Sequence, residues 1–259
     1  MIPTQVYRML TAEERIRMQA LIEDNLINGF AEMVDKTVEW IQTPAARDYF
    51  FNRQGQINRF YRESGIEDEW NNIIRERATK GAGIAEQIYT YARQMNTPEG
   101  ILEFNTREQN ILNNICDSNY ELVRNASEYE IQGIRRSILQ DVAEGVGPRQ
   151  TSLKEVQLQP INGLSPEQRA VMIARTETAT ITNTAALEQY KSDGVELVEL
   201  VGGGVGCCDE CEALIGEQIP IDEALEQPIL HPNCECTWRA VQPPLDMPHP
   251  NEPEGWLNQ

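Results

Sequence analysis

The chain has 259 residues, which suits one large or two small domains, and 40% hydrophobic content is enough to build a core. Its 41 acidic and 22 basic residues give a net charge of −19, so the surface should repel nucleic-acid phosphates and anionic lipids, which disfavours non-specific DNA wrapping. No run is long and apolar enough to span a membrane, and a mean hydropathy of −0.49 with 7% aromatics favours an elongated or thinly packed body.

The first part of the chain, to about residue 190, has a helical pattern. Thr11 and Glu14 form a capping box that predicts a helix start, and an apolar stripe follows until Pro44 stops it. The stripe consists of Met18, Ile22, Leu26, Phe30, Met33 and Ile41. The segment 47–77 has no clear period, and we expect its large aromatic residues to act as packing anchors. These are Phe50, Phe51, Phe60, Tyr61 and Trp70.

Glycines at 81 and 83 predict a break, followed by a short helix through Ala92 that ends near residues 96–98. A long helix is expected from about Thr106 to Ala143, closed by the glycine-rich 145–148. Its expected apolar positions are Ile111, Ile115, Leu122, Ala126, Tyr129, Ile138 and Val142. We expect most of these stripes to form an internal core, and some to face a partner.

Another helix is expected from the N-cap Ser165, closed in a capping box by Gln168, to a left-handed Gly194. The valine-rich run 195–201 and residues 237–241 predict two short strands. The predicted class is α+β, with a mainly helical, elongated N-terminal region before a small mixed α/β zinc-knuckle-like domain. The predicted boundaries are 1–163 for the helical region, 164–242 for the C-terminal domain and 243–259 for a Pro-rich tail.

Five of the six cysteines fall in one stretch of about thirty residues, which also holds one of the two histidines. Cys208 and Cys211 form a C-x-x-C pair, and His231 and Cys234 repeat that spacing as H-x-x-C. Cys236 adds a further ligand, and Cys207 is the cysteine that we would leave out. A mixed sulfur and imidazole set suits zinc, so these five residues are the predicted metal ligands and zinc the predicted structural cofactor.

Two other interpretations of the cysteines remain open. They could form disulfides, although no apolar N-terminal signal is present, or they could be plain reduced thiols. A catalytic zinc would need an open position and a general base, for which Asp209, Glu210 and Glu235 are nearby. Because the ligand supply is sulfur-rich and exceeds four, we expect a closed structural site and no enzyme activity.

Three motifs occur in order: Ala174-Arg175-Thr176-Glu177, then Cys208-x-x-Cys211 continuing to Glu217, then His231 to Thr237. Arg175 and Glu177 are two residues apart on a helix, so each needs a separate partner. Over roughly Leu164 to Val241 this order resembles the C-terminal domain of the phage Mu F-like, or head morphogenesis, family of tailed viruses.

The resemblance implies a minor head protein, carried in the virion head near the portal vertex and assembled in the host cytoplasm. It also implies contact with the portal or major capsid protein, and proximity to packaged DNA without strong binding. A role in genome delivery is a further expectation. The alternatives are a metal-dependent enzyme or effector domain, or a zinc-stabilised cellular adaptor. No contact with a membrane is expected.

The tail 243–259 is too proline-rich for a helix or a central strand, yet it carries Trp256 and Leu257. It could be a solvated end, or an extended arm that seats Trp256 on a neighbouring virion subunit or on its own zinc domain. Lysine occurs only at positions 36, 80, 154 and 191, and few lysines among many acids suggest adaptation to high salt.

Overall fold

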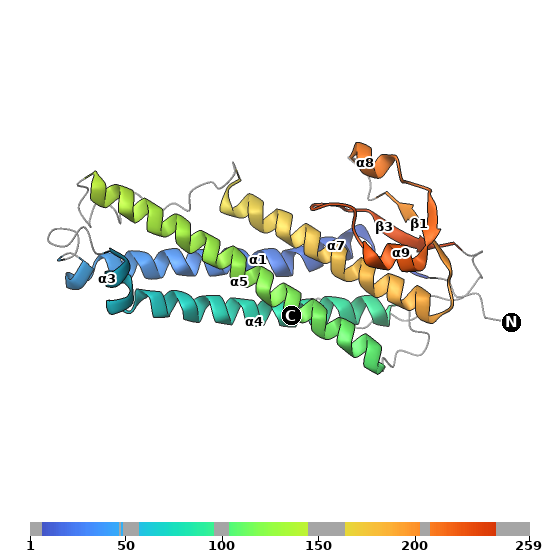
Figure 1. The fold of residues 1–259 in the computed structure, drawn as a ribbon, viewed down its shortest axis with the longest axis horizontal. Coiled ribbons are helices and arrows are strands. Elements are labelled where there is room, and N and C mark those ends of the chain that lie inside the picture. The colour runs from blue at the N-terminus through green and yellow to red at the C-terminus, as the bar shows by residue number, and fades with distance from the viewer. Residues whose placement is uncertain are drawn as a thin grey trace. The chain divides into compact units, whose positions relative to one another are not determined.

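The computed structural model describes residues 7–46, 48, 57–95, 104–144, 164–202 and 208–241, without the side chains of residues 57, 58, 60, 141 and 142. Long helices dominate these residues and a small antiparallel sheet lies near the C-terminus, which confirms the predicted α+β class (Figure 1). In chain order the elements are α1 (Ala12–Ile41), α3 (Ile57–Glu63), α4 (Ile66–Gln94), α5 (Thr106–Ala143), α7 (Pro166–Ser192), β1 (Leu197–Val201), α8 (Asp209–Glu212), β2 (Gln218–Pro220), α9 (Ile221–Glu226) and β3 (Thr237–Ala240). None of the described helices combines the length and apolar character that a membrane span requires.

The chain divides into two compact units that do not follow sequence order. Unit 1 consists of Met1–Ile22, Gly83–Asp117 and Val171–Gln259, and unit 2 of Glu23–Ala82 and Ser118–Ala170. Helices α1, α4, α5 and α7 therefore each contribute to both units. The predicted boundaries at residues 163 and 242 stay a prediction, and the tail 243–259 lies outside the described residues.

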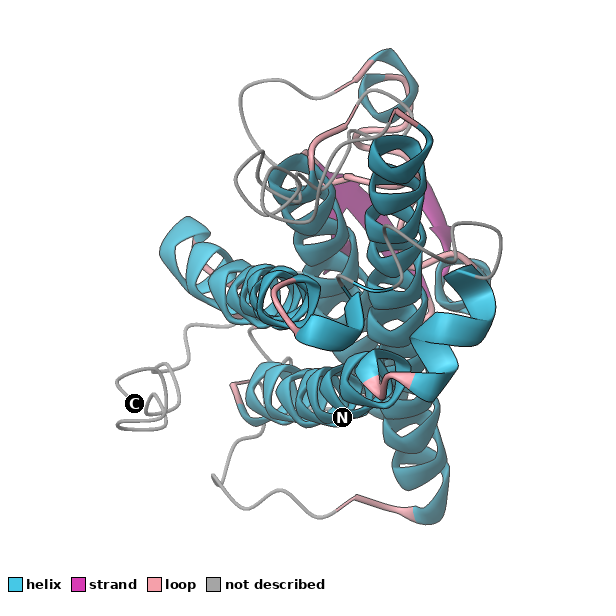
Figure 2. Ribbon diagram, turned by 90° about the vertical axis from the view of Figure 1, so that its left-hand side faces the viewer, coloured by secondary structure: helices cyan, strands magenta, loops and turns pink. Residues whose placement is uncertain are grey.

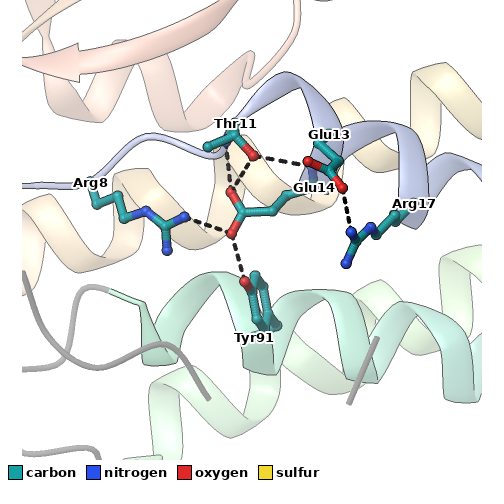
Figure 3. A network of polar contacts seen from close by, with 6 residues as sticks. All are labelled: Arg8, Thr11, Glu13, Glu14, Arg17 and Tyr91. Carbon is teal, nitrogen blue, oxygen red and sulfur yellow. Dashed lines mark hydrogen bonds and ion pairs between the residues drawn. The ribbon is translucent and has the colours of Figure 1, made fainter. Parts of the chain in front are cut away.

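The start of α1 has the predicted capping box. Glu14 Oε2 accepts hydrogen bonds from the Thr11 backbone N–H (2.7 Å) and hydroxyl (2.9 Å), and the Glu14 N–H donates to Thr11 Oγ1 at 3.2 Å (Figure 3). The predicted apolar stripe is buried along its whole length, and α1 ends at Ile41, before Pro44. The box at Ser165 and Gln168 is also present, with hydrogen bonds of 2.9 and 3.2 Å.

Glu14 is also buried in a polar network of unit 1. Its Oε1 accepts hydrogen bonds from Arg8 Nη2 (2.8 Å) and from the Tyr91 hydroxyl (2.7 Å), so the helix cap is joined to α4 (Figure 3). Burial alone would raise the pKa of Glu14, but the hydrogen bonds from Tyr91 and Thr11 and the charge of Arg8 lower it below its usual value.

Aromatic residues organise the core of unit 2. Tyr61 and Trp70 are each 1% exposed and their ring centroids lie 5.5 Å apart, which confirms these two anchors. The Trp70 indole donates a hydrogen bond to Thr37 Oγ1 at 3.0 Å, and the Arg135 guanidinium carbon lies 5.4 Å from both ring centroids. Phe50, Phe51 and the Phe60 side chain are outside the described part of the chain.

The predicted break at residues 81–83 is wrong, because α4 continues without interruption from Ile66 to Gln94. A Cβ added at Gly81 would lie 2.8 Å from Val123 Cγ2 and 3.0 Å from Asn119 Oδ1, both on α5. Gly81 therefore lets two helices of unit 2 approach closely, and its cost in helix propensity is outweighed by tertiary packing.

Helix α5 has the predicted extent, but several of the residues that were predicted to form its buried apolar face are not buried. Tyr129 is 48% exposed, and Ile111, Ile115, Leu122 and Ala126 are only half-buried. The buried face consists of Glu108, Leu112, Asn119, Val123, Ser127, Glu130, Ile131, Ile134 and Ile138. The interpretation assumed that buried residues are apolar, whereas here ion pairs bury two carboxylates, Glu108 with Arg93 in unit 1 and Glu130 with Arg169 in unit 2.

The sheet, whose strands are magenta in Figure 2, belongs to unit 1. Its strand order is β2-β1-β3, with both pairs antiparallel. Strands β1 and β3 were predicted, and they pair with Leu200 opposite Trp238. Strand β2, only three residues long, was not predicted. The sheet packs on the C-terminal part of α7 through Leu187 and Tyr190, and Gly194 ends that helix with the predicted positive φ of 80°.

Candidate metal centre

The first knuckle, residues 208–216, is a single helical turn. Cys208 precedes α8 and its carbonyl accepts a hydrogen bond from the Glu212 N–H at 2.8 Å, while the Cys211 carbonyl accepts one from the Ile215 N–H at 3.1 Å. The Gly216 N–H then donates to the Leu200 carbonyl at 3.0 Å. These bonds fix the C-x-x-C pair beside β1, with Cys208 exposed and Cys211 buried.

The second knuckle, residues 231–236, turns at Asn233, which adopts the left-handed region with φ of 65°. The Cys234 N–H donates to the His231 carbonyl at 3.2 Å and closes the turn. His231 Nδ1 lies 2.8 Å from the Pro232 carbonyl oxygen, so a proton on Nδ1 leaves Nε2 as the available ligand atom. Both Cys234 and Cys236 are buried.

The two knuckles bring all five predicted ligands together. His231 Nε2 lies 3.0 Å from Cys208 Sγ and 3.1 Å from Cys211 Sγ, and Cys211 Sγ lies 3.7 Å from Cys234 Sγ. Over the described residues the ligand atoms form two groups of three within 4.8 Å, one of Cys208, Cys211 and His231 and one of Cys211, Cys234 and Cys236. Cys211 belongs to both groups and is therefore the centre of the cluster. Cys207 lies outside the described residues.

One of these separations fits a tetrahedral ion, and the other two are shorter than such an ion requires. Zinc–sulfur bonds of about 2.3 Å place two sulfurs about 3.8 Å apart, and a zinc–nitrogen bond of about 2.0 Å gives a sulfur–nitrogen separation of about 3.5 Å. The Cys211–Cys234 separation of 3.7 Å matches the first value, and the sulfur–nitrogen contacts of 3.0 and 3.1 Å would widen by about half an ångström. Neither group of three includes a carboxylate, so Asp209, Glu210 and Glu235 are not in the cluster.

The electrostatics of the cluster depend on burial and on the histidine. The Cys211 backbone hydrogen bond and the nearby His231 lower the pKa of the Cys208 thiol, whereas burial raises that of Cys211. The hydrogen bond to the Pro232 carbonyl raises the pKa of His231. A divalent cation would favour both thiolates, since a coordinated thiol loses its proton.

Helix α7 holds the second knuckle through three side chains. Thr176 Oγ1 accepts the Asn233 N–H at 2.8 Å, and Asn183 Nδ2 donates to the Cys236 carbonyl at 3.0 Å. Arg175 Nε lies 3.6 Å from Glu235 Oε1, so Arg175 does pair with a residue other than Glu177. That pair is about half exposed and contributes at most about 1 kcal/mol. The role of Asn183 was missed, because no spacing in the sequence distinguishes it.

A family model described as Phage Mu protein F like protein matches residues 132–239. No curated protein and no solved structure matches the chain. The match includes the A-R-T-E segment of α7, both knuckles and most of β3, and it begins in α5, some thirty residues before the expected start at Leu164. The comparison thus confirms, over residues 132–239, the resemblance to phage Mu protein F like proteins that the three motifs indicated.

Proposed function

We propose that this chain is a minor head protein of a tailed virus, located in the virion head near the portal vertex, where it takes part in head morphogenesis. The observation that carries the proposal is the family match over residues 132–239, which indicates a phage head-related protein. A role in genome delivery is a second part of the proposal, to be tested separately.

The proposed partners are the portal protein, the major capsid protein or both. The net charge of −19 supports work close to packaged DNA without strong binding, since like charges repel phosphates. Exposed apolar side chains such as Ile16, Tyr129 and Leu139 offer contact points for protein partners.

The proposed cofactor is one structural zinc ion, bound by four of Cys208, Cys211, His231, Cys234 and Cys236. The cluster geometry supports this. Within the two knuckles themselves the buried residues are the cysteines Cys211, Cys234 and Cys236, so a bound ion would join the knuckles where they bury no other side chain. We propose no catalytic role for the ion.

The variant Cys211→Ser tests the proposed role of the metal, since it removes the residue common to both ligand groups. We expect it to abolish zinc binding and to increase hydrogen exchange in the segment 208–238, while the helices of unit 2 stay protected. Cys116→Ser, on α5 and in neither ligand group, is the control and should leave both properties unchanged. Equal zinc content in the two variants would contradict the assignment.

Particle composition tests the proposed location. Virions purified from a producing host should contain the protein in a few copies per head when quantified by mass spectrometry, and particles made without its gene should be defective in head assembly. A portal gene next to its own gene would agree with this role. Complete absence from purified particles and from assembly intermediates would contradict the proposal and would favour the cellular adaptor.

A further inference from the structure

Unit 1 contains a cavity of about 260 Å³, many times the ~10–15 Å³ that a single water molecule needs. It is lined by some of the side chains between Arg8 and Gln19 at the start of α1, Arg15 and Ile16 among them but not Arg17. Ala92 and Met95, part of α7 between Arg175 and Tyr190, and residues 234–237 complete the wall. Cys234 and Cys236 reach its wall, but the cavity extends well beyond the metal ligands. Neither the proposed zinc site nor the family match gives it a role.

The charge of the lining is opposite to that of the chain. Among the described residues, Arg8, Arg15 and Arg175 line the cavity with one carboxylate, Glu235, although acids outnumber bases by 41 to 22 in the whole sequence. Arg8 is paired with Glu14 and Arg175 with Glu235. Arg15 makes no ion pair with any residue that the structure describes, so the cavity retains positive charge and favours an anionic occupant.

One buried hydroxyl in the wall has no partner among the residues that the structure describes. Thr178 is 1% exposed, and its Oγ1 makes no hydrogen bond within the described part of the chain. The neighbouring threonines on α7 behave differently: Thr176, Thr180 and Thr182 each donate to the carbonyl four residues earlier, at 2.7 to 2.8 Å. Because buried polar groups are normally satisfied, the Thr178 hydroxyl is open to a hydrogen bond from an occupant of the cavity.

Apolar side chains complete the lining. Met9 and Ile16 are 41% and 63% exposed, and Leu10, Ala12, Ala179 and Ala186 lie beside them. Large exposed apolar residues at the wall of a cavity are typical of a binding site. The occupant should therefore combine an apolar group, a hydrogen-bonding group and negative charge.

We propose that this cavity binds the chain's own C-terminal segment, residues 243–259. The sequence of that segment, whose placement is outside the described residues, carries Asp246, Glu252 and Glu254 with no lysine or arginine, and it contains Trp256 and Leu257. The indole N–H of Trp256 is a donor that the Thr178 hydroxyl can accept, and a neighbouring carboxylate can pair with Arg15.

The length of the segment permits this contact. Thr237 lines the cavity and begins β3, and the segment starts two residues after Val241, the last described residue. At about 3.1 Å per residue for an extended proline-rich chain, the thirteen residues from Pro243 to Gly255 span about 40 Å. The proposal does not depend on the viral role, because it uses only contacts within this chain.

Fluorine NMR of the full-length protein labelled with 5-fluorotryptophan tests the inference. Trp256→Phe assigns the Trp256 signal, and a labelled synthetic peptide of residues 243–259 gives its free position. We expect the signal to be displaced from the free position in the unaltered protein, and to return toward it in Arg15→Ala and in Thr178→Val. The Trp70 and Trp238 signals report whether each variant is folded.

Arg17→Ala is the matched control, since Arg17 lies on the same turn of α1, pairs with Glu13 and does not line the cavity. It should leave the Trp256 signal in place. A Trp256 signal at the free-peptide position in the unaltered protein would overturn the inference, as would equal effects of the Arg15 and Arg17 variants. A displacement that disappears on dilution would overturn the intramolecular contact and assign the occupant to a second copy.

Discussion

The glycine at position 81 allows a sharp test of the packing in unit 2. Gly81→Ala places a methyl group 2.8 Å from Val123 Cγ2 and 3.0 Å from Asn119 Oδ1, and valine has little rotamer freedom to move away. Overpacking of this kind costs about 1–3 kcal/mol, from which a gain of about 0.5–1 kcal/mol in helix propensity must be subtracted. The net change should destabilise the protein by up to about 2.5 kcal/mol.

Gly83→Ala is the internal control, two residues further along α4. No atom of the described part of the chain lies within 4 Å of its added Cβ, so Gly83→Ala should stabilise the protein by the propensity gain alone, about 0.5–1 kcal/mol. The two variants should thus differ by about 1–3 kcal/mol, or roughly 2–12 °C in Tm when compared by thermal unfolding followed by circular dichroism. Val123→Ala should restore part of the loss in Gly81→Ala. Equal stability of the two alanine variants would refute the close helix contact.

Three further predictions concern charged groups. Arg93→Ala leaves the buried Glu108 carboxylate without its cation, so urea unfolding should show the free energy of unfolding lowered by about 3–5 kcal/mol. The control Lys36→Ala removes an exposed ion pair and should lower it by less than about 1 kcal/mol. Similar losses in the two variants would contradict the buried pair. Because the folded-state pKa of Glu14 is lowered, ionised Glu14 adds to the stability of the fold above the unfolded-state pKa of about 4.3, and this stability is lost as the pH falls through the folded-state pKa. Glu14→Gln should therefore lose less stability than the unaltered protein on acidification below about pH 5, and parallel pH profiles would be the contrary result. Finally, added salt should raise the melting temperature by screening the net charge of −19, and a Tm indifferent to salt up to molar concentration would remove the inference of high-salt adaptation.

Helix ends that are set by a few neighbouring residues could be predicted from the sequence. The capping boxes at Thr11 and Ser165 and the left-handed Gly194 satisfy or terminate backbone hydrogen bonds within a few residues, so their effect is independent of the rest of the fold. The knuckle spacing is local in the same way, and it predicted residues that the structure brings within a few ångströms of one another.

Features set by tertiary contacts were not predictable from periodicity. Glycine has a low helix propensity, so Gly81 predicts a break in the helix. The close approach of α5 explains why a glycine lies inside α4 at this position. The two carboxylates on the buried face of α5, Glu108 and Glu130, are stabilised there by Arg93 and Arg169, which come from other helices. Strand β2 is three residues long and includes a proline, so its pairing with β1 leaves no recognisable pattern.

Metal analysis of freshly purified, reduced protein tests the central claim most directly. We propose that one bound ion holds the two knuckles in place against α7 and the sheet. Inductively coupled plasma mass spectrometry on the full-length chain, purified without added metal or chelator, measures the stoichiometry. The account predicts about one equivalent of zinc per chain, held by the cluster around Cys211. Protein that is folded and reduced but carries no zinc would contradict it.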